Sequence, residues 1–139
     1  MVNGKSYMAY LPAALVAAGI AIVSLWENPQ MPEAVALTGK TWHLILYAVL
    51  GLALMAAFVV NSHTRLSHFV LACVSATAYG ALMEILQRFC TLTRSGEMAD
   101  LYADALGALI GVALVALWCL LRNKCENAKM SKCENDQML

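Results

Sequence analysis

Acidic, basic and imidazole side chains occur at helical spacing inside three stretches of sequence that are otherwise apolar. The stretch "AYGALMEILQRF", residues 78 to 89, contains Glu84, Gln87 and Arg88. Carboxylates and imidazoles can bind a cation, transfer a proton or hydrogen-bond to hydroxyl groups, whereas Lys and Arg pair with phosphate. The candidate polar residues of the three stretches are Lys40, His43, Tyr47, Glu84, Gln87, Arg88, Arg94, Asp100 and Asp104. These residue types suit a binding site, a catalytic site or a structural network of ion pairs.

Helical periodicity places the polar residues of each stretch on one face. At 100° per residue, each set falls within an arc of about 60° to 100°. The three faces carry Lys40, His43, Tyr47 and Gly51 in the first stretch, Gly80, Glu84, Gln87 and Arg88 in the second, and Asp100, Asp104, Gly107 and Gly111 in the third. Because glycine lets neighbouring backbones approach closely, we expect the four glycines to be helix-packing positions.

The elements that position these faces are predicted to be transmembrane helices. Hydrophobic residues make up 61% of the chain and charged residues 13%, with a mean hydropathy of +0.67, against roughly 45–50% and 25% in soluble domains. A spanning helix needs about 20 mostly apolar residues, and four runs qualify, at residues 8–26, 42–61, 68–88 and 101–121. The sequence therefore predicts an all-α polytopic membrane protein, a bundle of four transmembrane helices that forms one domain over residues 1–121.

The segment after the last apolar run, residues 122–139, differs from the rest in composition. It is rich in Lys and Glu, which predicts a charged, disordered tail. Cys125 and Cys133 lie in its repeated "KCEN" without a histidine nearby, which is a weak signal for a metal site. We therefore predict neither a metal nor any other cofactor.

The orientation follows from the distribution of Lys and Arg between the two sides of the membrane. With a cytoplasmic N-terminus, the inner side carries Lys5, Arg65, Arg122, Lys124, Lys129 and Lys132, and the outer side carries Lys40, Arg88 and Arg94. Positive charge accumulates on the cytoplasmic side of membrane proteins. Both termini are therefore predicted to be cytoplasmic, in a plasma (inner) membrane, and all three polar faces then end at the outer leaflet.

The converging faces are interpreted first as a polar pocket that opens to the outside. A charge inside a spanning helix costs about 2.5 kcal/mol or more, so Glu84 and Asp104 are expected to face the bundle interior and to pair. A purely structural alternative needs no ligand. In that alternative Glu84 pairs with Arg88 or Lys40. Asp104 then pairs with Arg94.

Other members of the set also have simple structural interpretations. His43 and Tyr47 could be interfacial amphiphilic residues. Asp100 could be the N-cap of the last helix, with its carboxylate meeting the free backbone N–H groups. Arg88 and Arg94 could be interfacial cations held near lipid phosphates.

Three classes of function suit the pocket. Beside the lipid bilayer itself, it could bind a lipid-linked cell-wall precursor or another anionic lipid head group. It could instead be an enzyme site for a lipid phosphate, with His43 and Glu84 as acid and base. Alternatively, a divalent cation, Mg²⁺ or Ca²⁺ by the oxygen-rich ligands, could be held there by Glu84, Asp100, Asp104 and His43. Transport ranks last, because the inner helix halves, such as "MAAFVV" and "VALVAL", are apolar. No catalytic residue is assigned, enzymatic activity is left open with a leaning against it, and no nucleic-acid partner is expected.

The order of the polar residues resembles a known family. The segment "GKTWHLILYAVLGLALM", followed by "AYGALMEILQRFCTLTRSGEMADLYADALGALIG", resembles the VanZ-like membrane proteins. Their pattern has Lys-x-x-His-x-x-x-Tyr-x-x-Leu-Gly, then Glu-x-x-Gln, an Arg, two Asp four residues apart, and Gly-x-x-x-Gly. On that resemblance the family positions fall on Lys40, His43, Tyr47, Glu84, Gln87, Arg94, Asp100 and Asp104.

The resemblance implies a bacterial cell-envelope protein linked to an antibiotic phenotype. The founding member of the family is associated with low-level resistance to the glycopeptide antibiotic teicoplanin, without an established biochemical mechanism. We therefore expect an outward-facing polar pocket that modulates susceptibility to teicoplanin-type antibiotics, and the resemblance implies no particular reaction.

Overall fold

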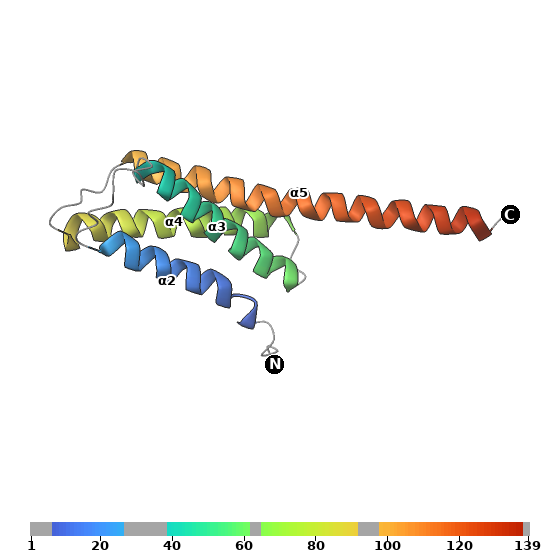
Figure 1. Ribbon diagram of the computed structural model, residues 1–139, viewed down its shortest axis with the longest axis horizontal. Helices are drawn as coiled ribbons and strands as arrows, with labels where there is room; N and C mark the ends of the chain where they lie inside the picture. The colour runs from blue at the N-terminus through green and yellow to red at the C-terminus, as the bar shows by residue number, and fades with distance from the viewer. Residues whose placement is uncertain (1–6, 27–38, 62–64, 92–97, 138–139) are drawn as a thin grey trace, which may run out of the picture.

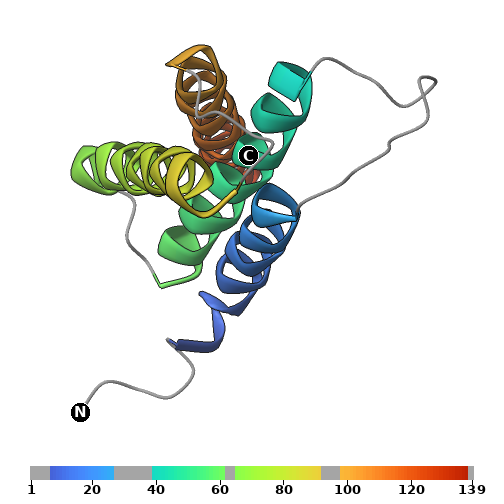
Figure 2. The same ribbon diagram turned by 90° about the vertical axis from the view of Figure 1, so that its left-hand side faces the viewer.

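The computed structural model describes residues 7–26, 39–61, 65–91 and 98–137, with side chains described as far as Asn123. Within these ranges it contains four α-helices and no strand, namely α2 (Leu11–Leu25), α3 (Gly39–Val60), α4 (Leu66–Cys90) and α5 (Met98–Gln137). The helices lie together in a bundle (Figure 1, Figure 2). The predicted all-α helix bundle is confirmed.

Three of the helices are long and apolar enough to cross a membrane. Their candidate spans are Lys40–Val60, Leu66–Cys90 and Met98–Asn123, with mean hydropathies of 2.4, 1.8 and 2.2. At 1.5 Å per residue each exceeds the roughly 30 Å of a hydrocarbon core. The runs predicted at 42–61, 68–88 and 101–121 therefore correspond to real helices, and each helix extends beyond its predicted run at one end at least.

Helix α2 is shorter than the run predicted at 8–26. Its regular part has 15 residues, or about 22 Å. Residues Tyr7 to Tyr10 form a separate turn, in which the Tyr10 N–H donates to the Tyr7 carbonyl at 3.0 Å. Pro12 then lies in the first turn of α2, where its missing N–H costs nothing and its fixed φ favours a helix start.

Helix α5 continues well past its candidate span. Its backbone remains helical as far as Gln137, and this part projects beyond the other three helices (Figure 1). The sequence predicts a disordered tail from residue 122, so the structure differs there. Nine of the 16 residues from Arg122 to Gln137 are Arg, Lys, Glu, Gln, Ala or Met, which have good helix propensity, and a prediction from charge alone does not take this into account.

Glycines bring α3 and α5 into close contact. A Cβ added at Gly107 would overlap the Leu44 carbonyl, and one at Gly111 would overlap the Ala48 carbonyl. On the opposite helix, a Cβ at Gly51 would lie 2.6 Å from the Ala108 carbonyl oxygen. Only residues without a side chain allow this backbone contact. This close contact fixes how the first turns of α3 and α5 lie relative to each other along the axis of the bundle.

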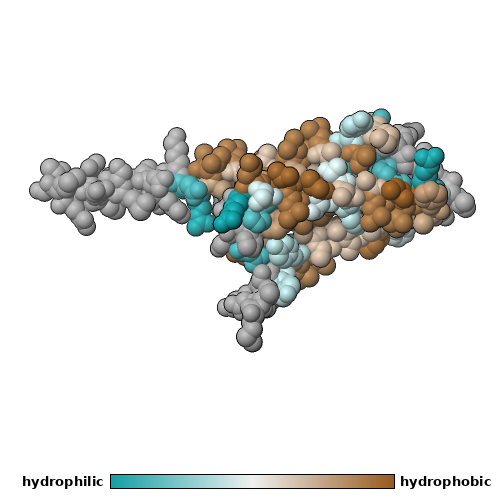
Figure 3. All heavy atoms as spheres, turned by 180° about the vertical axis from the view of Figure 1, so that it is seen from behind, coloured by the Kyte–Doolittle hydropathy of each residue, from teal (hydrophilic) through white to brown (hydrophobic). Residues whose placement is uncertain are grey.

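The outer surface of the bundle is apolar. Large hydrophobic side chains such as Leu71, Ile85, Leu109 and Leu114 are exposed on α4 and α5. Figure 3 shows hydrophobic residues over the middle of the bundle on one face, with hydrophilic residues nearer its two ends. An exposed apolar surface of this extent is expected where lipid chains, and not water, surround a protein. Length, hydropathy and surface together indicate a membrane protein.

Candidate functional site

Three helix segments meet at one end of the bundle. They are the first turns of α3 and α5 and the last turns of α4, and Figure 2 views the bundle from this end, which we call the site end. The chain reverses direction between successive helices, so polar residues near the start of one helix lie beside those near the end of the next. This is the arrangement that the sequence predicts for the three polar faces.

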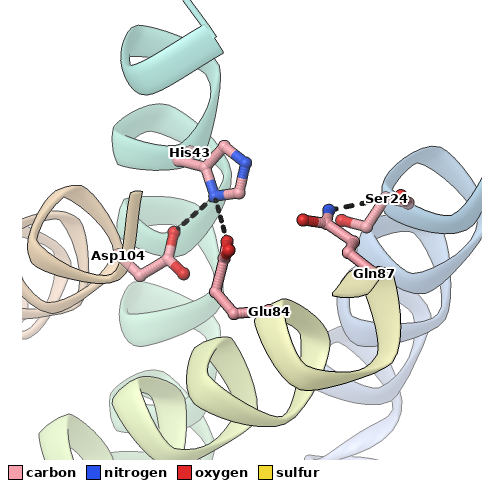
Figure 4. Close-up of polar contacts among 5 residues, drawn as sticks. All are labelled: Ser24, His43, Glu84, Gln87 and Asp104. Atoms are coloured by element: carbon pink, nitrogen blue, oxygen red, sulfur yellow. Dashed lines mark hydrogen bonds and ion pairs between the residues drawn. The ribbon is translucent and has the colours of Figure 1, made fainter. Parts of the chain in front are cut away.

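His43, Glu84 and Asp104 converge at the site end, one from each of α3, α4 and α5 (Figure 4). We call them the polar cluster. The imidazole Nδ1 lies 2.8 Å from Asp104 Oδ1, a hydrogen bond in which the ring N–H donates to the carboxylate. The same nitrogen lies 3.8 Å from Glu84 Oε1. A single imidazole therefore lies within reach of two carboxylates that are 20 residues apart in the sequence.

Asp104 is the most deeply buried member of the polar cluster. Its exposed fraction is 0%, whereas the side chains of His43 and Glu84 are 14% and 10% exposed. Gly80 makes room for the carboxylate, because a Cβ added there would lie 2.5 Å from Asp104 Oδ2. Gly80 was predicted as a helix-packing position. In the structure it packs against a side chain of the candidate site.

Tyr47 lies one helical turn after His43 on α3, and it is buried beside the polar cluster. The two rings are nearly parallel, with centroids 6.3 Å apart and an interplanar angle of 9°. Tyr47 is 1% exposed, and its hydroxyl has no hydrogen-bond partner among the residues that the structure describes. The Tyr79 ring lies 6.5 Å from that of Tyr47. Tyr47 is thus a core residue with a polar atom, and not an interfacial amphiphile.

Gln87 is directed at a different helix from the rest of the set. Its amide Nε2 donates to the Ser24 carbonyl of α2 at 3.2 Å, and the side chain is buried (Figure 4). Tyr79 makes a similar contact, donating from its hydroxyl to the Ala17 carbonyl at 2.7 Å. Both residues therefore fasten α2 to α4. The sequence could not indicate these acceptors, because they are backbone carbonyls with no signature of their own.

The remaining predicted residues surround the polar cluster or lie outside the described part. Lys40 and Arg88 are exposed, each within about one turn of a cluster residue on its own helix. Asp100 is partly buried in the first turn of α5, but the helix begins at Met98, so Asp100 is not its N-cap. It still faces the positive end of the helix dipole. Arg94 lies outside the described residues.

The polar cluster has the chemical groups for proton transfer and for metal binding. A carboxylate that holds one ring nitrogen of a histidine leaves the other nitrogen to exchange protons with a ligand, and Figure 4 shows the second nitrogen of His43 turned away from both carboxylates. The three side chains also offer one potential metal-ligand atom each, all within 4.8 Å of one another. The sequence offered Glu84, Asp100, Asp104 and His43 as ligands of a divalent cation, and the described structure brings three of these four together.

Comparison with known proteins identifies the family to which this geometry belongs. No curated protein and no solved structure matches the chain. A family model described as VanZ/LLP1 matches residues 6–120. This range contains α2, α3, α4, the part of α5 that packs against them, and every candidate polar residue. The match covers most of the 139 residues and agrees with the order of polar residues along α3, α4 and α5. The chain is therefore a member of the VanZ/LLP1 family of membrane proteins.

Proposed function

We propose that this protein binds the head group of a lipid-linked cell-wall precursor at the outer leaflet of a bacterial plasma membrane. In doing so it modulates susceptibility to teicoplanin-type glycopeptide antibiotics, which act on the cell envelope. The observation that carries the proposal is the convergence of His43, Glu84 and Asp104 from three helices at one end of the bundle, with His43 and Glu84 still partly accessible.

The polar residues of the site end suit a head group that combines phosphate with hydroxyl or amine groups. Lys40 and Arg88 are exposed there and can pair with phosphate. The partly accessible His43 can donate a hydrogen bond to a sugar hydroxyl, and Glu84 can accept one from a hydroxyl or an amine. A simple anionic lipid would use only the two cations, so a precursor with a sugar and a peptide uses more of the site.

The site end is assigned to the outside by charge. The opposite end carries Arg65 and Arg122. Four of the five Lys residues of the chain precede α2 or follow Arg122 in the sequence. The excess of positive charge on that side supports cytoplasmic termini. A site near the outer surface then lies where precursors are exposed before they are incorporated into the wall.

The proposal predicts selective head-group binding by the purified protein in phosphatidylcholine nanodiscs. A fluorescent polyprenyl-diphosphate-linked sugar-peptide should bind more tightly than phosphatidylglycerol. Replacing both Lys40 and Arg88 by Gln should weaken binding roughly tenfold or more, because each cation near a phosphate contributes about 1 kcal/mol. Equilibrium titration of fluorescence anisotropy measures both effects.

The matched control replaces Arg65 and Arg122, at the opposite end, by Gln and should leave binding unchanged. Equal binding of the precursor and phosphatidylglycerol, or equal effects of the two double variants, would argue against the proposal. In cells that express these proteins, teicoplanin susceptibility should follow precursor binding across the variants.

A second candidate function is an enzyme that acts on a lipid phosphate. It is favoured by the 2.8 Å contact between His43 and Asp104, an arrangement found in general acid–base catalysis. The nanodisc titration separates the two candidates, because an enzyme would release phosphate from the bound lipid over time. Stable binding without phosphate release supports a binding protein.

A further inference from the structure

The geometry of the polar cluster satisfies the first requirement of a metal site, which is several ligand atoms close to one point. His43, Glu84 and Asp104 each offer one such atom, and these atoms lie within 4.8 Å of one another. The imidazole nitrogen is 2.8 Å from one carboxylate oxygen and 3.8 Å from the other. In a tetrahedral site with bonds of about 2.1 Å, neighbouring ligand atoms lie roughly 3.4 Å apart. The two distances bracket this value, and the third pair, the two carboxylate oxygens, lies within 4.8 Å. Shifts of about 1.4 Å or less would therefore complete a three-ligand set.

An orphaned oxygen is a second and independent indication of a ligand. Asp104 is fully buried, and its Oδ2 has no hydrogen-bond partner among the residues that the structure describes. Figure 4 shows this carboxylate turned into the space between α3, α4 and α5, toward Glu84. A buried carboxylate oxygen without a partner costs free energy, which a bound cation would recover.

The polar cluster is also assembled on a rigid frame. Gly80 leaves room for the Asp104 carboxylate, and the glycine contacts between α3 and α5 set the distance between His43 and Asp104. Three ligands on three packed helices are held more precisely than ligands on loops. Protein sites with three ligands and one remaining position are typical of metals that also bind a substrate or an inhibitor.

We propose that His43, Glu84 and Asp104 bind a divalent transition-metal ion, with Zn²⁺ as the best fit. The reason is the ligand type, because an imidazole nitrogen selects Zn²⁺ over Mg²⁺ and Ca²⁺, which prefer all-oxygen sites. The remaining coordination position faces the accessible side of the cluster, where a phosphate or hydroxyl oxygen can enter. The inference rests on the proposed function for the identity of that incoming group, while metal binding itself needs no lipid ligand.

The direct test is metal binding by the full chain in phosphatidylcholine nanodiscs after treatment with a chelator. Cys90, Cys125 and Cys133 are first replaced by Ser, so that their thiolates contribute nothing. Titration calorimetry, together with elemental analysis after gel filtration, should give one Zn²⁺ per chain, and Mg²⁺ should bind at least tenfold more weakly. H43Q, E84Q and D104N should each weaken Zn²⁺ binding tenfold or more. No bound Zn²⁺, or equal affinity for Mg²⁺, would overturn the proposal.

His68 provides the matched control, because it lies in the first turn of α4 at the opposite end of the bundle. H68Q should leave Zn²⁺ binding unchanged, and a loss equal to that in H43Q would contradict the assignment. The absorption spectrum of bound Co²⁺ in the parent protein gives a measurement that needs no variant. Intense d–d bands that disappear on addition of Zn²⁺ support the proposed ligands, whereas the spectrum of hydrated Co²⁺ would overturn them.

Failure of this inference can be distinguished from failure of the proposed function. Precursor binding that persists after complete removal of metal, in a protein that takes up no Zn²⁺, overturns the metal site and leaves the proposed function standing. Stoichiometric Zn²⁺ binding without any head-group preference supports the metal site and overturns the proposed function.

Discussion

Replacing His43 by Leu is expected to destabilise the protein by about 3–5 kcal/mol, the cost of leaving a buried carboxylate without its partner. Asp104 is fully buried and bonds the imidazole at 2.8 Å, while its second oxygen has no partner among the described residues. Without the imidazole, the carboxylate would lose the hydrogen bond that offsets the free-energy cost of its burial. Unfolding of the protein in nanodiscs or mild detergent, followed by circular dichroism, measures the loss.

The double variant with both His43 and Asp104 replaced by Leu separates lost pairing from lost packing. It removes the buried carboxylate as well, so it should regain most of the stability that His43→Leu alone loses. A positive coupling energy between the two positions is the expected signature. If His43→Leu were as stable as the parent, Asp104 would not depend on the imidazole, and the description of the polar cluster would be wrong.

Gly111→Ala is expected to destabilise the protein by about 1–3 kcal/mol, the usual cost of overpacking a close contact. The new methyl group would overlap the Ala48 carbonyl of α3, and backbone cannot move aside as a flexible side chain can. The separation of α3 and α5 should therefore increase. Since His43 and Asp104 are on these two helices, the hydrogen bond between them should weaken as well. Thermal unfolding gives the first effect, and the loss of Zn²⁺ affinity the second.

Gly19 is the matched control for this substitution. It is also a glycine inside a helix, but a Cβ added there would have nothing within 4 Å. Gly19→Ala should leave stability unchanged or raise it slightly, because alanine favours a helix by about 0.5–1 kcal/mol over glycine. Equal effects of the two substitutions would mean that the α3–α5 contact does not depend on glycine.

The helices and their shared polar end could be predicted from sequence because both follow from periodicity and hydropathy. Apolar runs near 20 residues indicated α3, α4 and the first part of α5, and a 100° repeat brought His43, Glu84 and Asp104 toward one region. The length of α2 was predicted less well, since hydropathy does not register the turn before Pro12. The prediction of a disordered tail relied on charge and not on helix propensity, whereas α5 continues to Gln137.

The specific partners in the site could not be predicted, because they depend on which helices are neighbours. Periodicity placed Gln87 on the same face as Glu84, yet Gln87 bonds the Ser24 carbonyl of α2. A face about 100° wide can contact two neighbouring helices, and no pattern in one sequence decides between them. The sequence also offered Arg94 as a partner for Asp104, but Arg94 lies outside the described residues, and within them the partner of Asp104 is His43. The imidazole was predicted as a candidate, but its position between two carboxylates from different helices depends on how the helices pack.

The central claim is that the polar cluster is a ligand site and not only an ion-pair network that holds the helices together. The most direct measurement compares the melting temperatures of the parent, Asp104→Asn and Glu84→Gln proteins in lipid nanodiscs without added ligand. Each amide has nearly the size of the carboxylate and keeps hydrogen-bonding capacity while removing charge. Because functional sites often sacrifice stability, both variants are expected to melt at or above the temperature of the parent. A sharp drop in both, corresponding to about 3–5 kcal/mol, would show that the carboxylates mainly stabilise the bundle, and it would contradict the claim.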